Sequence, residues 1–377
     1  MDLAHFDEMV RALQVGDPVD WGAVCEAESF AAFLHRLDLH GVAAGLQLDE
    51  TVPPDVAEQI KRRRMHAIFW ETEHQEMLVA LLNALENEGV ESLIIKGTAL
   101  AYGLYADPHL RIRADTDLVV RKADRACVEE ILFEHGFSPL TVADSDVLVG
   151  ELCWRKVGKN GPQSVDLHWR VMNNAFLGDI FELEELFARS VPLPRLHASA
   201  KATHPVDALA IACVHRLVHL QSPYYVGGVA YKEPDRLIWL RDIDLLVRSL
   251  DQNDEATFVK EAQARGIVAA CYDGLTCANR VMGTPMIDEL AYLRSETSGE
   301  ASEKFLHAGQ TGQVLMNVSA AKGFRGLLSN IGAILLPSAA YMKHRYPQSG
   351  WPLPFLYFHR ALSGLASAIA RTFARRD

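Results

Sequence analysis

The most informative stretch of the chain is Leu93-Ile-Ile-Lys-Gly-Thr98, followed after a polar loop by Asp115-Thr-Asp-Leu-Val-Val120. The first segment predicts a strand over 90–95 that ends in a tight turn, and the second predicts another strand over 115–120. Because side chains alternate along a strand, Asp115 and Asp117 project from the same face. Two such carboxylates repel each other unless a cation lies between them or one pKa rises. The pattern therefore predicts a cation site beside a turn whose N–H groups suit a phosphate.

This pattern resembles the nucleotidyltransferase fold of the DNA polymerase β superfamily, in which a strand and a Gly-Ser-like turn precede an Asp-x-Asp strand. It is most similar to a bacterial family of uncharacterised nucleotidyltransferases with Lys-Gly turns, through 96–100, Tyr105, Arg111 and 115–120. Here the loop before the first Asp is longer than usual, and Thr98 replaces the more common Ser. The resemblance implies an α+β fold. It consists of a polymerase-β-like core, with a small mixed sheet and helices, flanked by N- and C-terminal helical regions.

A third carboxylate is expected on Val165-Asp-Leu-His-Trp169, which is similar to the third-carboxylate strand of the family. The turn signal at 158–161 predicts a hairpin of strands 152–157 and 164–171. Asp166 then shares a face with His168, which could touch a phosphate or simply pack against the hairpin. Taken alone, Asp166 could equally be a solvent-facing strand residue. Beside Asp115 and Asp117 we favour a metal-binding role.

The resemblance implies Mg²⁺-dependent transfer of a nucleotide from an NTP to an unidentified acceptor hydroxyl or phosphate. Two Mg²⁺ ions, or Mn²⁺ in their place, would be held by the catalytic carboxylates Asp115, Asp117 and Asp166. The electrostatic reason is that carboxylates and a triphosphate repel strongly in a low-dielectric cleft unless divalent cations lie between them. Gly97 and Thr98 would cradle the β- and γ-phosphates.

Five further residues are candidate substrate contacts. Lys96, Arg111 and Arg113 could neutralise the leaving pyrophosphate, although both arginines could also be ordinary loop surface. His215 lies on a predicted helix over 208–220, where the family carries a histidine near its site. Asp242 could approach the site on its own, without the neighbouring Asp244.

A second Asp-x-Asp sequence, Asp242-Ile-Asp244, does not predict a second metal site. Its apolar neighbours recur at helical spacing over 237–250. Residues two apart on a helix point about 200° away from each other, so these carboxylates cannot share one ion.

Helical patterns at both ends of the chain and a mixed pattern of strands and helices between them predict three regions. Residues 1–88 form an N-terminal helical region, residues 89–195 form the nucleotidyltransferase core, and residues 196–377 form a C-terminal helical domain. Segment 361–376 predicts an amphipathic helix with a basic end. This helix could dock on the body of the protein or contact a membrane surface or a protein partner.

Composition narrows the functional classes further. The net charge of −12 argues against nonspecific binding to a nucleic-acid backbone, so no stable nucleic-acid binding is expected. The six cysteines form no CxxC pair, so neither a zinc knuckle nor a redox motif is indicated. The acidic N-terminal residues lack a signal sequence and no apolar run could span a bilayer, so we predict a cytoplasmic protein.

Two alternative functions stay open at this stage. A nucleotide-sugar glycosyltransferase also uses Asp-x-Asp to hold a metal-bound diphosphate, but this alternative explains neither Gly97-Thr98 nor Asp166. A non-catalytic nucleotide-binding or partner-binding module on the same fold is the second alternative.

Overall fold

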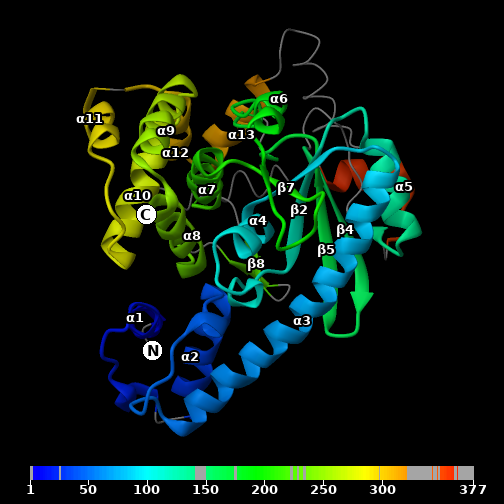
Figure 1. The fold of residues 1–377 in the computed structure, drawn as a ribbon. Coiled ribbons are helices and arrows are strands. Elements are labelled where there is room, and N and C mark those ends of the chain that lie inside the picture. The colour runs from blue at the N-terminus through cyan, green and yellow to red at the C-terminus, as the bar shows by residue number, and fades with distance from the viewer. Residues whose placement is uncertain are drawn as a thin grey trace.

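The computed structural model describes residues 3–24, 27–140, 150–173, 176–220, 224–226, 229–231, 235–296, 298–320 and 349–360, together with Met342, Tyr346 and Ser363. Within these residues the protein is a mixed α+β structure, as predicted (Figure 1). A seven-stranded sheet lies between helices that come from both ends of the chain.

The sheet has the strand order β3-β4-β5-β2-β1-β7-β6 and contains both parallel and antiparallel pairs. Its centre is β2, which pairs antiparallel with β1 and parallel with β5. A separate two-stranded sheet consists of β8 and β9. The strands are β1 (Ser92–Ile95), β2 (Asp115–Val120), β3 (Ser138–Pro139), β4 (Glu151–Gly158), β5 (Gly161–His168), β6 (Val191–Pro192), β7 (Lys201–Ala202), β8 (Tyr224–Val226) and β9 (Val229–Tyr231).

Helices precede, interrupt and follow the sheet in sequence. They are α1 (Leu3–Val15), α2 (Ala27–His40), α3 (Pro54–Asn87), α4 (Lys96–Gly103), α5 (Arg125–Glu134), α6 (Leu183–Ala188), α7 (Pro205–His219), α8 (Leu237–Ser249), α9 (Gln252–Ala264), α10 (Val268–Met282), α11 (Asp288–Glu296), α12 (Ala301–His307) and α13 (Gln310–Ser319). Short 3₁₀ turns lie at Trp21–Val24 (η1), Ala43–Gly45 (η2) and Pro108–Leu110 (η3).

The long helix α3 connects the N-terminal helices to the sheet (Figure 1). It begins after Pro53, because proline is well suited to the first helical turn, and the chain leaves it through Gly89 at φ 69°. Its middle carries Glu73, whose carboxylate accepts hydrogen bonds from the backbone N–H groups of Lys159 and Asn160. A single side chain of α3 thus fixes the turn of the β4–β5 hairpin.

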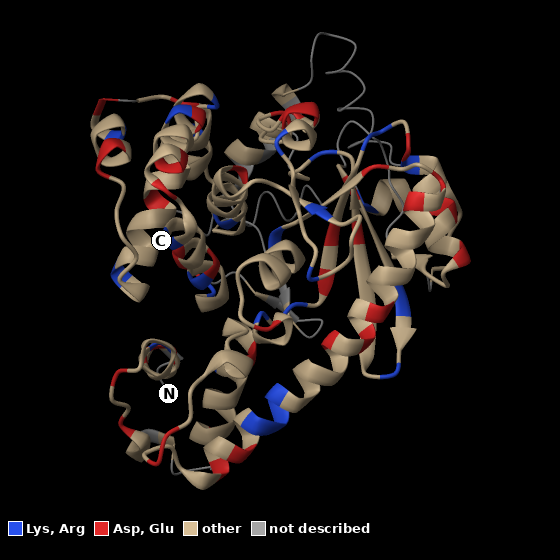
Figure 2. Cartoon of the chain, viewed as in Figure 1, with Lys and Arg blue, Asp and Glu red and all other residues tan. Residues whose placement is uncertain are grey.

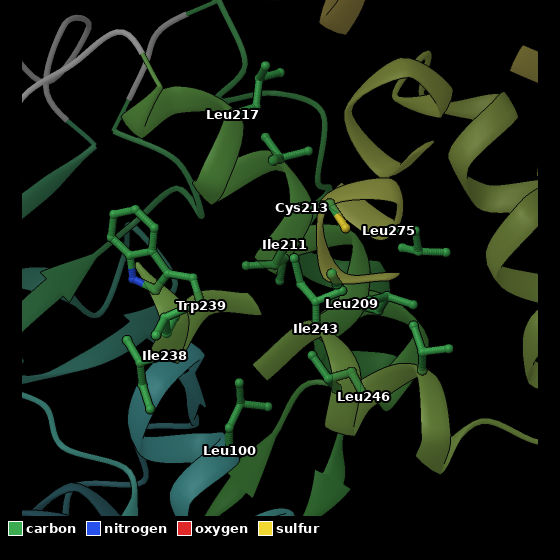
Figure 3. Packing of buried hydrophobic residues seen from close by; sticks show 14 of the residues in the cluster. Leu100, Leu209, Ile211, Cys213, Leu217, Ile238, Trp239, Ile243, Leu246 and Leu275 are labelled. Atoms are coloured by element: carbon green, nitrogen blue, oxygen red, sulfur yellow. The ribbon is translucent and has the colours of Figure 1, made fainter. Parts of the chain in front are cut away.

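One hydrophobic cluster joins regions that are far apart in the sequence. It includes Phe6 of α1, Phe33 of α2, Leu93 of β1 and Phe305 of α12. Figure 3 shows part of this cluster, in which side chains of α4, α7, α8 and α10 interdigitate. A second cluster fills the space between α3, α5 and the other face of the sheet. The N- and C-terminal helices therefore share a core with the sheet.

The side chain of His204 caps α7 by accepting a hydrogen bond from the backbone N–H of Val206. The connection between α7 and α8 contains the β8–β9 hairpin. Apart from Ser363, the segment 361–376, which was predicted to be a helix, lies outside the described residues.

The basic run Lys61-Arg-Arg-Arg64 on α3, visible as a blue band in Figure 2, is largely engaged by neighbouring groups. Arg63 pairs with Asp38, and Arg64 donates to the carbonyl oxygens of Ala44 and Leu46. These contacts hold α3 to the N-terminal helices. In the part of the chain that the structure describes, no helix is both long enough and apolar enough to cross a membrane.

Candidate active site

The acidic residues of the predicted site lie on neighbouring parallel strands. In the register of β2 and β5, Asp117 is opposite Asp166, and Asp115 is opposite Ser164. Ligand atoms of Asp117, Asp166 and His168 lie within 4.8 Å of one another. The structure therefore brings together two of the three predicted carboxylates with the predicted histidine. Asp115 lies on the same face of β2, two residues before Asp117.

Asp117 is held by two nitrogen donors. Its Oδ1 atom accepts hydrogen bonds from Lys96 Nζ at 2.6 Å and from His168 Nε2 at 2.9 Å. The other ring nitrogen of His168 faces the carbonyl oxygen of Arg170 at 3.2 Å and a carboxylate oxygen of Glu151 at 3.4 Å. Both ring nitrogens of His168 thus face acceptors, which favours the protonated imidazolium.

Asp166 is different, because its Oδ1 atom is buried and has no hydrogen-bond partner among the described residues. An unpaired buried carboxylate oxygen is costly and calls for a partner. The oxygen of Asp166 is therefore the atom of this site that most clearly lacks a cation or a donor.

The pKa values of the three carboxylates are driven apart. Burial, with repulsion from Asp166 and Asp117, raises the pKa of Asp115 to about 7. Burial and repulsion from Asp117 also raise the pKa of Asp166. Burial alone would raise the pKa of Asp117, but the charge of Lys96 and the hydrogen bond from His168 hold it below the usual range. Such divergent values in a cluster are typical of functional sites.

The predicted Gly-Thr turn is the first turn of α4, which follows β1 directly. The hydroxyl group of Thr98, in this turn, is fully buried and lies 2.8 Å from Thr116 Oγ1. The same hydroxyl accepts a hydrogen bond from Arg113 Nε at 2.8 Å. Because protein groups already occupy this hydroxyl, it is not free to bind a phosphate, and the backbone N–H of Thr98 lies in the first turn of α4. The N–H of Gly97 lies in the same first turn.

The two predicted arginines are both engaged with carboxylates. Arg111 donates from Nε and Nη2 to the carboxylate of Asp242, at 3.0 Å and 2.7 Å. Arg113 pairs with Glu71 of α3 at 2.7 Å and is almost completely buried. Arg113 is therefore built into the interior of the protein. Arg111 approaches the site while Asp242 holds its guanidinium.

Asp242 and Asp244 point to different surroundings, as their helical spacing predicts. Asp242 accepts from Tyr105 as well as from Arg111. Asp244 instead pairs with Arg248 and Thr284. The second Asp-x-Asp sequence therefore lies on helix α8 and cannot clasp one ion.

An aromatic wall from α7, α8 and β8 flanks the site, and we define it as His215, His219, Tyr224 and Trp239. His215 contacts Trp239 edge to face, with ring centroids 5.4 Å apart. Burial lowers the pKa of His215 well below its ordinary value. The charges of Lys96 and Asp117 also act on this residue. Helix α7 thus brings the predicted His215 within electrostatic range of Lys96 and Asp117.

Sequence reasoning missed a basic residue beside this wall, Arg236, whose guanidinium lies over the rings of Tyr224 and Trp239. Its backbone partner is the carbonyl oxygen of Leu39. No carboxylate among the described residues forms a salt bridge with it, and burial together with repulsion from Arg111 lowers its pKa to about 10. No local sequence signal could have placed Arg236 here, because its position depends on how α8 packs.

Two residues of β4 were also missed, although a signal for them was present. Opposite Asp166 in the hairpin lies Cys153, and opposite His168 lies Glu151. The thiol of Cys153 has a raised pKa because of burial and the charge of Asp166. Extending the predicted hairpin register from its turn would have placed both side chains on the same face as the carboxylates of the predicted site.

This donor set fits a hard divalent cation. Carboxylate oxygens suit Mg²⁺ and Mn²⁺, and Asp166 supplies an oxygen that has no other partner among the described residues. His168 could join as a ligand only after losing a proton. The residues that could hold a metal are therefore Asp117 and Asp166, with Asp115 and His168 beside them.

Comparison with known proteins agrees with this geometry. A family model described as an uncharacterised nucleotidyltransferase matches residues 25–283, which include α2 to α10 and every residue of the site. No curated protein matches the chain. Because the family model covers more than half of the chain, the protein belongs to this family of uncharacterised nucleotidyltransferases.

Proposed function

We propose that the protein transfers a nucleoside monophosphate from an NTP to an acceptor hydroxyl or phosphate, in a reaction that depends on Mg²⁺ or Mn²⁺. The observation that carries the proposal is the pairing of Asp117 with Asp166 across two parallel strands, with a buried Asp166 oxygen that has no described partner. A structural ion pair would satisfy that oxygen within the protein, whereas a metal-bound substrate would satisfy it on binding.

We assign the metal-binding and phosphate-binding roles in this reaction to separate groups of residues. Asp115, Asp117 and Asp166 would hold two divalent ions, which would supply the positive charge that neutralises the triphosphate and lowers the pKa of the acceptor. The backbone N–H groups of Gly97 and Thr98, at the start of α4, bind phosphate oxygens because a helix N-terminus favours anions.

The outer part of the site would bind the rest of the nucleotide. Lys96 and Arg111 face the leaving pyrophosphate, together with Arg236. His215 borders the nucleotide from α7. Asp242 would orient the guanidinium of Arg111 by accepting a hydrogen bond from it. Arg113 would hold the hydroxyl of Thr98 in place by donating a hydrogen bond to it.

The reaction forms one bond and breaks one. The acceptor oxygen attacks the α-phosphorus, the bond from that phosphorus to the β-phosphate oxygen breaks, and pyrophosphate leaves with the electron pair. A carboxylate oxygen of Asp166 would accept the proton of the acceptor. His168 would hold the carboxylate of Asp117 in place through the hydrogen bond from its Nε2 atom.

The test uses the full-length protein with each of the four NTPs, labelled on the α-phosphate, and Mg²⁺ or Mn²⁺. Label that appears on the protein or on an added acceptor, with release of pyrophosphate, supports transfer. Asp117→Asn should lower the rate by about three orders of magnitude, which corresponds to ~4 kcal/mol of transition-state stabilisation. The matched control is Asp38→Asn, because Asp38 is exposed and pairs with Arg63 on α3.

The alternatives give different results in the same assay. NTP binding without turnover, under all metals and acceptors, would favour a non-catalytic nucleotide-binding module. Turnover of a UDP-sugar in place of an NTP would favour a glycosyltransferase. Equal rates for Asp117→Asn and the intact protein would remove the assigned site.

A further inference from the structure

Lys96 has a backbone conformation that side-chain-bearing residues normally avoid. It is the single described non-glycine residue with φ in the left-handed region, at 53°. There its Cβ approaches a carbonyl oxygen too closely, so such a residue persists only where its surroundings force the geometry. Lys96 lies between the end of β1 and the rest of α4. A strained residue at this junction indicates that its side chain has a particular task.

That side chain points at a proposed metal ligand. Lys96 Nζ lies 2.6 Å from Asp117 Oδ1, and their side chains are only 17% and 11% exposed. Arg111 and Arg113, by contrast, pair with Asp242 and Glu71, which no part of the proposal uses as ligands. Lys96 is therefore the basic residue of the site whose charge occupies a position beside a metal-binding oxygen.

An ammonium group and a divalent ion compete for the same carboxylate. They repel each other, and an oxygen held at 2.6 Å by Lys96 must be released or shared before a metal can bind it fully. Asp166, on the next strand, offers a buried oxygen with no described partner at all. In the metal-free protein, the site is thus neutralised on the Asp117 side and incomplete on the Asp166 side.

We propose that Lys96 is a built-in counter-ion that occupies Asp117 in the metal-free protein and transfers to the triphosphate when a metal–NTP complex binds. Free metal ions then bind weakly, because displacing the ammonium leaves Lys96 buried without a partner. A metal that arrives with an NTP binds well, because the phosphates replace Asp117 as the partner of Lys96. This inference rests on the proposed function and adds an order of binding to it.

The test measures metal binding directly. The intact protein and Lys96→Met are titrated with Mn²⁺, and free Mn²⁺ is followed by electron paramagnetic resonance, with and without a non-hydrolysable NTP. Without nucleotide, Lys96→Met should bind Mn²⁺ about tenfold more tightly than the intact protein, because a competing charge is gone. With nucleotide the order should reverse, because the variant has lost a phosphate contact. In EDTA the variant should melt at a lower temperature than the intact protein, and millimolar Mn²⁺ should reduce the difference.

Two further variants keep the test decisive. Lys96→Gly also removes the ammonium, and glycine adopts φ 53° without strain, so this variant should fold and show the same tightening. Lys201→Met removes a lysine that pairs with Glu91 at 2.8 Å outside the site, and Mn²⁺ binding should not change.

The result that overturns the inference is Mn²⁺ affinity that is unchanged or weaker in both Lys96 variants. If this occurs while the intact protein binds Mn²⁺ and transfers nucleotides, the counter-ion role fails and the proposed function stands. If the intact protein binds no Mn²⁺ even with nucleotide, both fail together.

Discussion

Three basic residues close to the site each have a different carboxylate partner. Lys96 pairs with Asp117, Arg111 with Asp242, and Arg113 with Glu71. Burying both members of such a pair is costly, so each pair persists only with good geometry and additional hydrogen bonds. Removing one member would leave a buried charge unpaired. Neutral substitutions at Arg113 should therefore impair folding more than catalysis.

Arg236 is the residue whose substitution should most clearly affect substrate binding. It is a buried cation beside Arg111, and no described carboxylate forms a salt bridge with it. An anionic ligand would supply the missing charge. We expect Arg236→Gln to raise the KM for the NTP about tenfold, or ~1.4 kcal/mol of binding free energy. Steady-state kinetics measures this, and Arg248→Gln is the control, because Arg248 pairs with Asp244 on the same helix.

Thr98 carries a buried hydroxyl whose contribution to stability can be measured. Thr98→Val removes an oxygen that receives a hydrogen bond from Arg113 and contacts Thr116 in a buried region. The unfolding free energy should fall by about 1–3 kcal/mol, because the partners lose a buried hydrogen bond. Thr98→Ser keeps the hydroxyl and should remain within about 1 kcal/mol of the original protein. Chemical denaturation measures both values, and equal stability of Thr98→Val and the intact protein would contradict this structural role.

At the scale of elements, α3 is attached to the sheet by a chain of buried polar groups. Thr116 Oγ1 of β2 lies 2.7 Å from His74 Nε2, and His74 Nδ1 lies 2.5 Å from Gln163 Oε1 of β5. The network is consistent if Nδ1 carries the proton and donates to Gln163, while Nε2 accepts from Thr116. His74 is then neutral in the folded protein.

The neutrality of His74 gives a prediction for the pH dependence of stability. Burial, with the nearby charge of Arg113, lowers the pKa of His74 to about 3, whereas in the unfolded chain it is 6.5. Between pH 6.5 and 3 the unfolded state binds a proton that the folded state does not, so acid favours unfolding. His74 should cost about 1.4 kcal/mol of stability per pH unit over this range. Denaturation at several pH values should show a shallower slope for His74→Gln, whereas His66→Gln, at an exposed position of α3, should keep the original slope.

The elements that the sequence predicted well are those with local signals. Strand β2 was predicted with the bounds it has, because Asp115-Thr-Asp117 alternates charged and uncharged residues and leads directly into the apolar run Leu118-Val-Val120. The β4–β5 hairpin followed from the turn at 158–161. The partners of the arginines could not be predicted, because Asp242 is 131 residues from Arg111 and Glu71 is 42 residues from Arg113. Such pairings depend on the packing of whole helices.

At the scale of the whole molecule, the division into three regions at residues 88 and 195 remains a prediction, and the shared core bears on it. Leu93 of β1 and Leu100 of α4 lie in the same cluster as Phe33 of α2 and Leu246 of α8. Each of these side chains contributes about 1.5–3 kcal/mol when it is fully buried. The central sheet therefore depends on helices from both flanking regions for much of its core.

We expect that residues 89–195 alone do not fold, although they contain the three carboxylates. Without α3, the sheet loses the side chains of Leu78, Leu81 and Leu82, which are buried against it, and without α7 and α8 its other face is exposed to water. Such a segment would expose apolar surface that a stable domain of its size must bury. An amide correlation spectrum of the isolated segment should show the narrow dispersion of an unfolded chain, whereas residues 3–320 should give a dispersed spectrum. Well-dispersed resonances from residues 89–195 would instead identify the sheet as an autonomous domain, and the flanking helices would then serve the site without being needed for the fold.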